Sequence, residues 1–192
     1  MHSKLLSVIL MATMVAGESI YDFKVNDIKG NPVHLNDYKG KALLILNTAS
    51  QCGHTDAHLK ALKRLHEILS YENRFEILAF PCNDFGEQEP WEATEIEEFV
   101  KSHHKCEFPL MEKVKITGEN ANPLWKYIIK TTQVSPTWNF QKYLFDSNGK
   151  FVKSWDANTS IESIFDDIKA VVDRVPVKET ASDSEEANKI EL

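Results

Sequence analysis

Apolar residues follow two periodicities along the chain, one typical of strands and one of helices. The apolar runs at 42–48 and 75–80 predict two buried strands, because they are short, rich in branched residues and bounded by polar turns. Over 56–70, between these runs, apolar residues recur every three or four positions and predict an amphipathic helix. The inner face of this helix would consist of Leu59, Leu62, Leu65, Ile68 and Leu69.

The rest of the pattern completes one α/β domain over 18–177. Thr94, followed three residues later by Glu97, predicts the capped start of a helix. Strand, helix and strand, followed by helix, hairpin and closing helix, is the element order of a thioredoxin-like fold. Such a fold has a central mixed sheet flanked by helices, here with an N-terminal β-hairpin. The further predicted elements are a hairpin (22–27 with 32–35), helices over 94–103, 123–131 and 161–172, and a second hairpin (143–146 with 151–155).

The two ends of the chain fall outside this domain. Residues 1–17 begin polar and basic, continue with an apolar stretch too short for a comfortable membrane span, and end in small residues, which predicts a signal peptide. A buried first helix and an uncleaved anchor are the alternatives. Residues 178–192 predict an acidic, flexible tail, and its last four residues (KIEL) resemble an endoplasmic-reticulum retrieval signal. Together the ends predict a protein of the endoplasmic reticulum lumen, with secretion as the alternative.

Composition and charge limit the classes of partner. The chain has 192 residues and a formal net charge of −7, which argues against nucleic acid or an anionic membrane surface as the main partner. Three cysteines are few for a disulfide framework, so thiol chemistry explains them better. Residues 158–160 form a glycosylation sequon, whose occupancy the sequence leaves open.

Cys52 stands between the strand predicted at 42–48 and the helix predicted at 56–70. Free backbone N–H groups and the positive end of a helix dipole favour a thiolate at such a junction, so Cys52 is a candidate nucleophile. A dithiol exchanger would need a second cysteine at position 55, but Thr55 is there. Cys52 therefore acts alone or with a distant partner.

Two short stretches contain the residue types that bind metal ions. Neither has the spacing of a four-ligand zinc site, so no metal or other cofactor is expected. His54 and His58 are instead expected on one solvated helix face. The two stretches contain Cys52, His54 and His58, and His103, His104 and Cys106.

Several segments together carry a specific resemblance to a known family. In chain order they are 47–53 (NTASQCG), 80–83 (FPCN), 88–90 (QEP) and 138–140 (WNF). By these segments the chain resembles the glutathione peroxidases, from about residue 21 to residue 175. That family reduces hydroperoxides on a thioredoxin-like fold. Its catalytic tetrad corresponds here to Cys52, Gln88, Trp138 and Asn139.

The resemblance implies a thiol-dependent peroxidase that acts on hydrogen peroxide or on organic or lipid hydroperoxides. Cys52, where many members have selenocysteine, would attack the peroxide and become a sulfenic acid. Gln88 and Asn139 would supply amide donors, and Trp138 an indole N–H that donates but cannot accept. The alternative is a non-catalytic redox sensor that delivers a disulfide to partners, which would have no need of these three side chains.

The resemblance also suggests how the sulfenic acid is removed. Plant- and yeast-like members carry a resolving cysteine at a place that corresponds to 98–100, where this chain has none. The endoplasmic-reticulum branch of the family pairs its nucleophile with the position of Cys82, so Cys82 is the resolving candidate and Cys106 the alternative. That branch implies protein disulfide isomerase as the reductant, beside glutathione. The short segment 131–137 lacks the insertion of tetrameric relatives, so a monomer is expected, and Asp84 adds a negative charge that would oppose a thiolate.

Overall fold

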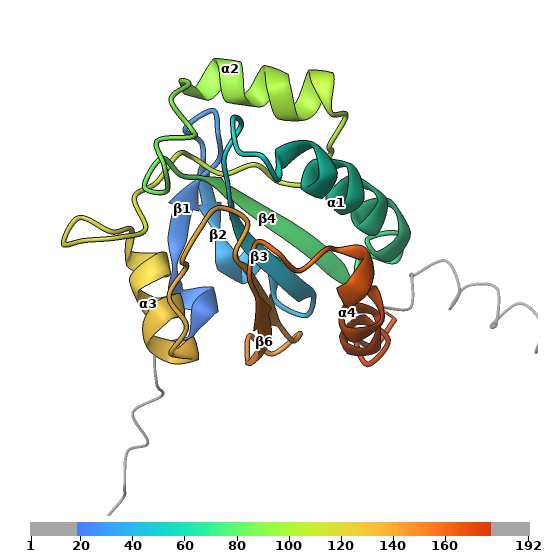
Figure 1. Ribbon diagram of the computed structural model, residues 1–192. Coiled ribbons are helices and arrows are strands. Elements are labelled where there is room, and N and C mark those ends of the chain that lie inside the picture. Colours follow the sequence, from blue (N-terminus) through green and yellow to red (C-terminus); the bar gives the residue numbers. More distant parts are fainter. Residues whose placement is uncertain (1–18, 178–192) are drawn as a thin grey trace, which may run out of the picture.

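A four-stranded mixed sheet forms the centre of the computed structural model, which describes residues 19–177 (Figure 1). The strand order is β4-β3-β5-β6. The central strand β3 pairs in parallel with β4 and antiparallel with β5, and β5 pairs antiparallel with β6. This arrangement matches the predicted mixed sheet. The strands are β3 (Ala42–Thr48), β4 (Phe75–Pro81), β5 (Lys142–Phe145) and β6 (Phe151–Trp155).

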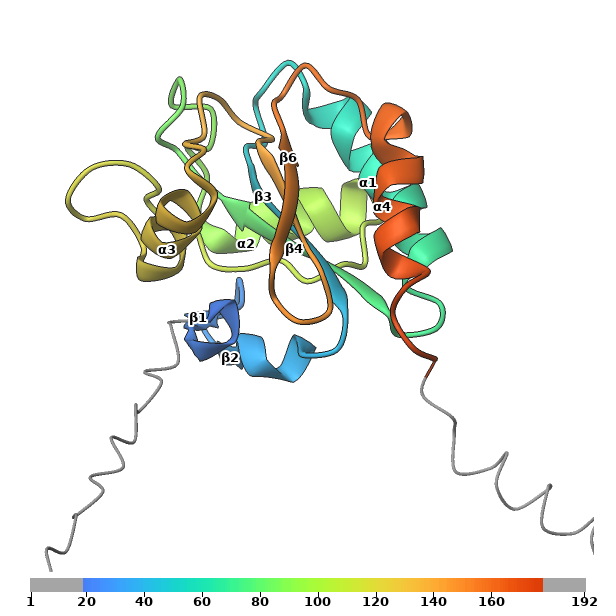
Figure 2. The same cartoon turned by 90° about the horizontal axis from the view of Figure 1, so that it is seen from below.

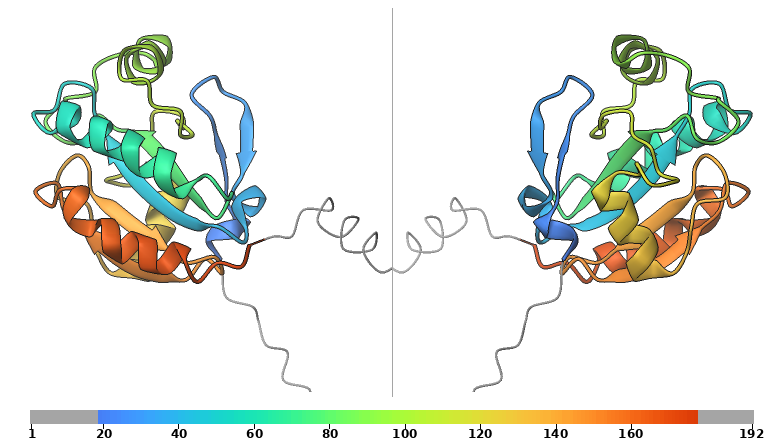
Figure 3. Two further views of the ribbon diagram at one scale, coloured as in Figure 1. Left: turned by 90° about the vertical axis from the view of Figure 1, so that its right-hand side faces the viewer. Right: turned by 90° about the vertical axis from the view of Figure 1, so that its left-hand side faces the viewer.

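Helices cover both faces of this sheet. Helices α1 and α4 lie side by side on one face, and α3 lies on the other face (Figures 2 and 3). Helix α2 continues directly into a π-helix. The helices are α1 (Thr55–Leu69), α2 (Ala93–Glu97) with the π-helix Glu98–His103, α3 (Pro123–Thr132) and α4 (Phe165–Val172). Short 3-10 helices span Ile20–Asp22, Leu35–Tyr38 and Glu162–Ile164.

The predicted N-terminal hairpin is present but stands apart from the central sheet. Strands β1 (Lys24–Asn26) and β2 (Pro32–His34) form a separate antiparallel pair. The carboxylate of Asp27 accepts hydrogen bonds from the backbone N–H groups of Lys29 and Asn31, which closes the turn between the strands. The hairpin packs on the α3 side of the sheet, where Val25 joins the apolar core.

Strand β3 is buried on both faces, and its side chains alternate between two apolar clusters. Leu44 and Leu46 belong to the cluster beneath α1 and α4, which we call the α1 cluster. Leu43 and Ile45 belong to the cluster beneath α3, which we call the α3 cluster. A continuous apolar run is therefore needed in this strand, as its sequence indicates.

Two residues of α1 differ from the prediction. His58 is not on a solvated face: it is 5% exposed and its ring stacks on Phe140 with centroids 4.8 Å apart. It lies one turn before Leu62 on the face that packs on the sheet. Ile68 was expected in the core but is 59% exposed, at the rim of a hollow between α1 and α4 that Leu65 and Ile161 also line. The face of α1 that packs on the sheet is thus turned toward His58 and away from Ile68.

The helix expected to start at Thr94 begins one residue earlier. Its N-cap is Glu92, whose side chain accepts from the third helical residue, Glu95, while the Glu95 carboxylate accepts from the backbone N–H of Glu92. A capping box is present, as predicted, but it is shifted by two residues, because a glutamate carboxylate takes the role expected of the threonine hydroxyl.

The predicted signal peptide (1–17) and acidic tail (178–192) lie outside the described residues. Within 19–177, no helix has both the length and the apolar character needed to cross a bilayer. The same part of the chain brings together no group of three or more His, Cys, Asp or Glu side chains suited to a metal ion.

Candidate active site

Cys52 lies in the turn that joins the end of β3 to the start of α1. Cys52 is 7% exposed, so the residue is largely enclosed. Thr55 closes the turn, because its backbone N–H donates to the carbonyl of Cys52 (3.0 Å) and its hydroxyl donates to the carbonyl of Ala49 (2.6 Å). The residue that replaces a second cysteine thus has a structural role as the first residue of α1.

The loop after β4 is bonded directly to this turn. The backbone N–H of Gln51 donates to the carbonyl of Gln88 over 2.9 Å. The carboxylate of Glu89 accepts from both the backbone N–H (2.8 Å) and the hydroxyl (2.9 Å) of Ser50. The two residues that precede Cys52 are therefore fixed by Gln88 and Glu89.

Asn47 fixes the third segment of the site, which leads into β5. Its side chain is fully buried, donates from Nδ2 to the carbonyl of Trp138 (3.2 Å) and accepts at Oδ1 from the backbone N–H of Gln141 (3.0 Å). Its own carbonyl accepts from the N–H of Phe140 (2.8 Å), a residue with φ of 64°. One side chain at the end of β3 thus sets the position of Trp138 and Asn139.

Asn139 orients the side chain of Gln88. Asn139 is fully buried, and its Nδ2 donates to the Gln88 Oε1 (3.0 Å) and to the carbonyl of Phe85 (3.1 Å). Both N–H bonds of the asparagine are used in this way. Because the Gln88 oxygen is occupied as an acceptor, its Nε2 is left as the amide donor of the pair.

Trp138 packs over Gly86 in the same loop. A Cβ atom placed on Gly86 would lie 2.9 Å from the indole Cη2 and 3.5 Å from Cδ of Gln88, so the ring, the glycine and the glutamine are in close contact. The indole is 39% exposed, which leaves part of it open to a substrate. Contacts between loops therefore bring Gln88, Trp138 and Asn139 together, and backbone hydrogen bonds join them to the Cys52 turn.

The three cysteines occupy different environments, and all are free thiols. Cys52 belongs to the α1 cluster, whereas Cys82, the residue after β4, belongs to the α3 cluster and is fully buried. Burial raises the pKa of Cys82 to about 12, and its Sγ accepts from the N–H of Asp84. Cys106 is buried in the α1 cluster, where burial raises its pKa to about 11 and its thiol lies 3.6 Å from the carbonyl of Leu59. Both thiols are protonated at neutral pH.

Asp84 is occupied by the neighbouring backbone. Its Oδ2 accepts from the N–H groups of Ile116 (2.6 Å) and Thr117 (2.8 Å) and from the Thr117 hydroxyl. Burial acts to raise the pKa of Asp84, but these hydrogen bonds outweigh it and lower the pKa. The charge of Asp84 therefore holds the 116–117 segment, and it raises the pKa of Cys82.

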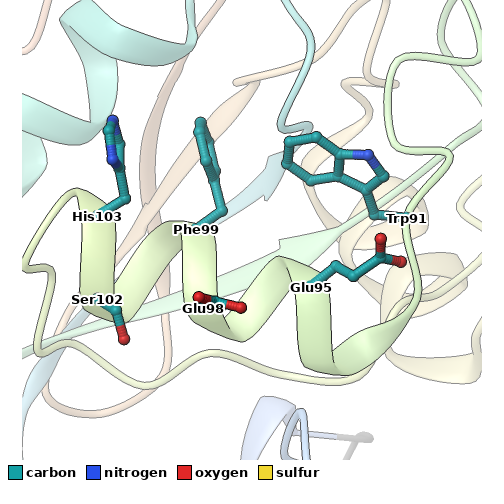
Figure 4. Close-up of a pocket in the computed structure, with 6 residues that line it drawn as sticks. All are labelled: Trp91, Glu95, Glu98, Phe99, Ser102 and His103. Carbon is teal, nitrogen blue, oxygen red and sulfur yellow. The ribbon is translucent and has the colours of Figure 1, made fainter.

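The segment formed by α2 and the π-helix has an aromatic surface. A hollow of about 520 Å³ lies along α2 and the π-helix, and the rings of Trp91, Phe99 and His103 project from one side of this segment in a row (Figure 4). Phe99 stacks on His103 and meets Trp91 edge-on, with ring centroids 5.6 Å and 5.3 Å away. The lining of the hollow contains none of the four candidate active-site residues.

Sequence inspection missed three residues that build the site: Asn47, Ser50 and Glu89. All three lie within or beside the motifs already noted, but only their hydrogen bonds reveal their roles. A polar residue at position 47, at the end of an otherwise apolar strand, was the available signal for Asn47, because a buried amide needs partners.

Comparison with known proteins identifies the family of the chain. The family model described as glutathione peroxidase matches residues 20–129, which include Cys52 and Gln88. Glutathione peroxidase 7 of Bos taurus is 42% identical over 161 residues, covering 84% of this chain and 86% of that protein. Probable glutathione peroxidase 8 of Homo sapiens is 41% identical over 160 residues, covering 83% and 76%.

Solved structures support the same assignment. The crystal structure of Trgpx in its apo form has a TM-score of 0.69 and 34% identity, covering 83% of this chain and 99% of that one. A thiol:disulfide interchange protein of the thioredoxin family from Chlorobium tepidum has a TM-score of 0.61 at 13% identity, covering 78% and 92%, and confirms the thioredoxin-like fold. On the family match and these identities, the chain is a peroxidase, an oxidoreductase, and it belongs to the glutathione peroxidase family.

Proposed function

We propose that the protein reduces hydroperoxides through a sulfenic acid on Cys52. The Cys52 thiolate attacks one peroxide oxygen, the O–O bond breaks and an S–O bond forms. The departing oxygen takes up a proton and leaves as water or an alcohol. The sulfur is oxidised by two electrons and the peroxide is reduced by two.

The hydrogen bond between Asn139 and Gln88 carries this proposal. It leaves the Gln88 Nε2 as a donor in the loop that is bonded to the Cys52 turn. A donor held in one orientation stabilises negative charge on sulfur or on the leaving oxygen without reorganising during the reaction. The part-exposed indole of Trp138 packs over Gly86 in the same loop as Gln88, and its N–H is a second donor in the proposal.

We propose Cys82 as the resolving cysteine. In support, its backbone N–H donates to the carbonyl of Thr48 (2.9 Å), so its backbone adjoins the end of the strand that leads to Cys52. Its thiol lies in the other apolar cluster and is protonated, so the loop after β4 has to open before it reacts. The Cys82 thiolate would then attack the Cys52 sulfur, form an S–S bond and release the sulfenic oxygen as water.

Peptide mapping after limited peroxide tests the choice of partner. We expect a Cys52–Cys82 disulfide, which should form unchanged in Cys106→Ser and be absent in Cys82→Ser. A Cys52–Cys106 disulfide in the wild-type protein would show that the other thiol in the α1 cluster resolves the sulfenic acid.

The reductant and the compartment are proposed from the sequence. The predicted signal peptide and the retrieval-like tail favour the endoplasmic reticulum lumen, where protein disulfide isomerase or glutathione would return the disulfide to two thiols. We propose that the protein acts as a monomer. Comparing turnover with protein disulfide isomerase, glutathione and thioredoxin as reductants ranks the three.

Peroxide consumption separates the enzyme from the alternative of a non-catalytic redox sensor. Wild-type protein should consume peroxide through many turnovers when a reductant is present, and Cys52→Ser should not. An equal rate in Cys52→Ser would refute the assignment of the nucleophile. Consumption that stops after a single equivalent with every reductant would favour the sensor.

A further inference from the structure

Glu89 is a buried carboxylate that the proposed reaction does not use. Its side chain is 1% exposed, and its Oε2 accepts the two hydrogen bonds from Ser50. Its other oxygen, Oε1, is equally buried and has no hydrogen-bond partner among the described residues. A buried carboxylate with one free oxygen can take up a proton there while Oε2 keeps its contacts.

The backbone on both sides of this carboxylate is fixed. The N–H of Glu89 donates to the side-chain oxygen of Asn83 (2.8 Å), and the carbonyl of Gln88 accepts from Gln51. Gln88 and Glu89 therefore bind two consecutive residues, Ser50 and Gln51, through three hydrogen bonds. Cys52 is the next residue, so its position depends on this clamp.

The pKa of the Glu89 carboxyl lies near neutral pH. Burial raises the pKa of Glu89 to about 7, while the hydrogen bonds from Ser50 and the charge of Lys113 act to lower it. Lys113 comes from the segment after Met111. It donates to the carbonyl of Trp91 (2.7 Å) and lies 3.8 Å from the carboxylate of Glu92. On the turn that Glu89 contacts, the titratable residue nearest to Ser50 in sequence is Cys52.

We propose that Glu89 is a positioning residue for Cys52, a clamp on the nucleophile turn whose strength depends on its protonation. The ionised carboxylate accepts charge-assisted hydrogen bonds from Ser50, which are about twice as strong as neutral ones. The protonated form accepts through a neutral oxygen and holds the turn less firmly. This inference rests on the proposed role of Cys52 as the nucleophile.

The test is the pH profile of the reaction of reduced protein with hydrogen peroxide, measured with Glu89→Gln beside the wild type. Glutamine keeps an oxygen that can accept from Ser50 but cannot ionise. At about pH 6 the two proteins should react at similar rates, because the wild-type carboxylate is largely protonated there. At about pH 8.5 the wild type should be roughly 3- to 10-fold faster, because only its clamp is charge-assisted.

The matched control is Glu87→Gln, which removes an exposed carboxylate two residues away and should leave the profile unchanged. A ratio of wild type to Glu89→Gln that stays constant with pH would overturn the inference, since a purely structural role predicts that result. The same profile change in Glu87→Gln would also overturn it. A Cys52→Ser protein that still reacts would refute the proposed function instead.

Ser50→Ala keeps the question testable if Glu89→Gln does not fold. The alanine removes the hydroxyl donor and keeps the backbone donor. Loss of one hydrogen bond to the carboxylate destabilises its ionised form, so the ionisation near neutral pH should move to higher pH. An ionisation that does not move would contradict the assignment to Glu89.

Discussion

Asn47→Ala tests how the fold positions Trp138 and Asn139. The substitution removes both side-chain hydrogen bonds of a fully buried residue, the one donated to Trp138 and the one accepted from Gln141. The carbonyl of Trp138 and the backbone N–H of Gln141 then lose these partners. The backbone bond from Phe140 to the carbonyl of residue 47 would remain, as would the bonds of the Asn139 amide to Phe85 and Gln88.

The size of the effect follows from the cost of unpaired groups. A buried donor or acceptor that loses its partner costs about 1–3 kcal/mol. Two such groups would cost about 2–6 kcal/mol if both stayed dry. Because water can reach part of the segment, we expect the lower part of this range, a loss of about 2–4 kcal/mol in the free energy of unfolding. Displacement of the Asn139 amide, which orients Gln88, should also lower kcat/KM for peroxide by roughly 10-fold or more.

Urea denaturation and steady-state peroxidase assays measure the two effects. Asn36→Ala is the control, since Asn36 is exposed and its side chain makes no hydrogen bond among the described residues; its free energy of unfolding should stay within about 0.5 kcal/mol of the wild type. The reasoning would be refuted by an Asn47→Ala protein with wild-type stability and wild-type kcat/KM. Lower stability with unchanged kcat/KM would refute only the link to catalysis.

Two further substitutions test the packing of the site. Gly86→Ala should lower the free energy of unfolding by about 1–2 kcal/mol and change the Trp138 fluorescence, because Gly86 has φ of +68° and a Cβ there would lie 2.9 Å from the ring. Gly118→Ala, with φ of +75° and open space around it, should show the strain without the fluorescence change. Burial, and then the charge of Lys142, lower the pKa of His58 to about 4, so its contribution to stability is present above about pH 6.5 and is lost as the pH falls toward 4. Between about pH 7.5 and about pH 5, the free energy of unfolding should fall by about 2 kcal/mol more in the wild type than in His58→Leu, because the other titrating groups, Glu89 among them, contribute equally to both proteins. An equal change in both proteins would contradict this.

Most of the fold could be predicted from the hydrophobic pattern. The buried run of β3 and the helical spacing of α1 leave few alternatives, because both faces of β3 must be covered. The errors lie where tertiary packing decides. His58 is buried because the ring of Phe140, 82 residues later in the chain, stacks on it. The local sequence around His58 does not indicate this contact.

The candidate site could likewise be predicted from the sequence only in part. Sequence motifs predict Cys52, Gln88, Trp138 and Asn139, because each belongs to a short segment of characteristic sequence. Asn47 and Glu89 act through hydrogen bonds to segments far along the chain, so their importance depends on a geometry that residue type alone does not give. The separation of Cys82 from Cys52 into two apolar clusters likewise follows from the alternation along β4 and from the turn after β3.

Trapping the sulfenic acid tests the central claim most directly. Reduced protein with Cys82→Ser is treated with a single equivalent of hydrogen peroxide in the presence of dimedone, which reacts with sulfenic acids, and the labelled peptide is identified by mass spectrometry. We predict that the label is on Cys52 and is absent from the double variant that carries both Cys82→Ser and Cys52→Ser. A label on Cys106, or peroxide consumption with no label on Cys52, would contradict the account.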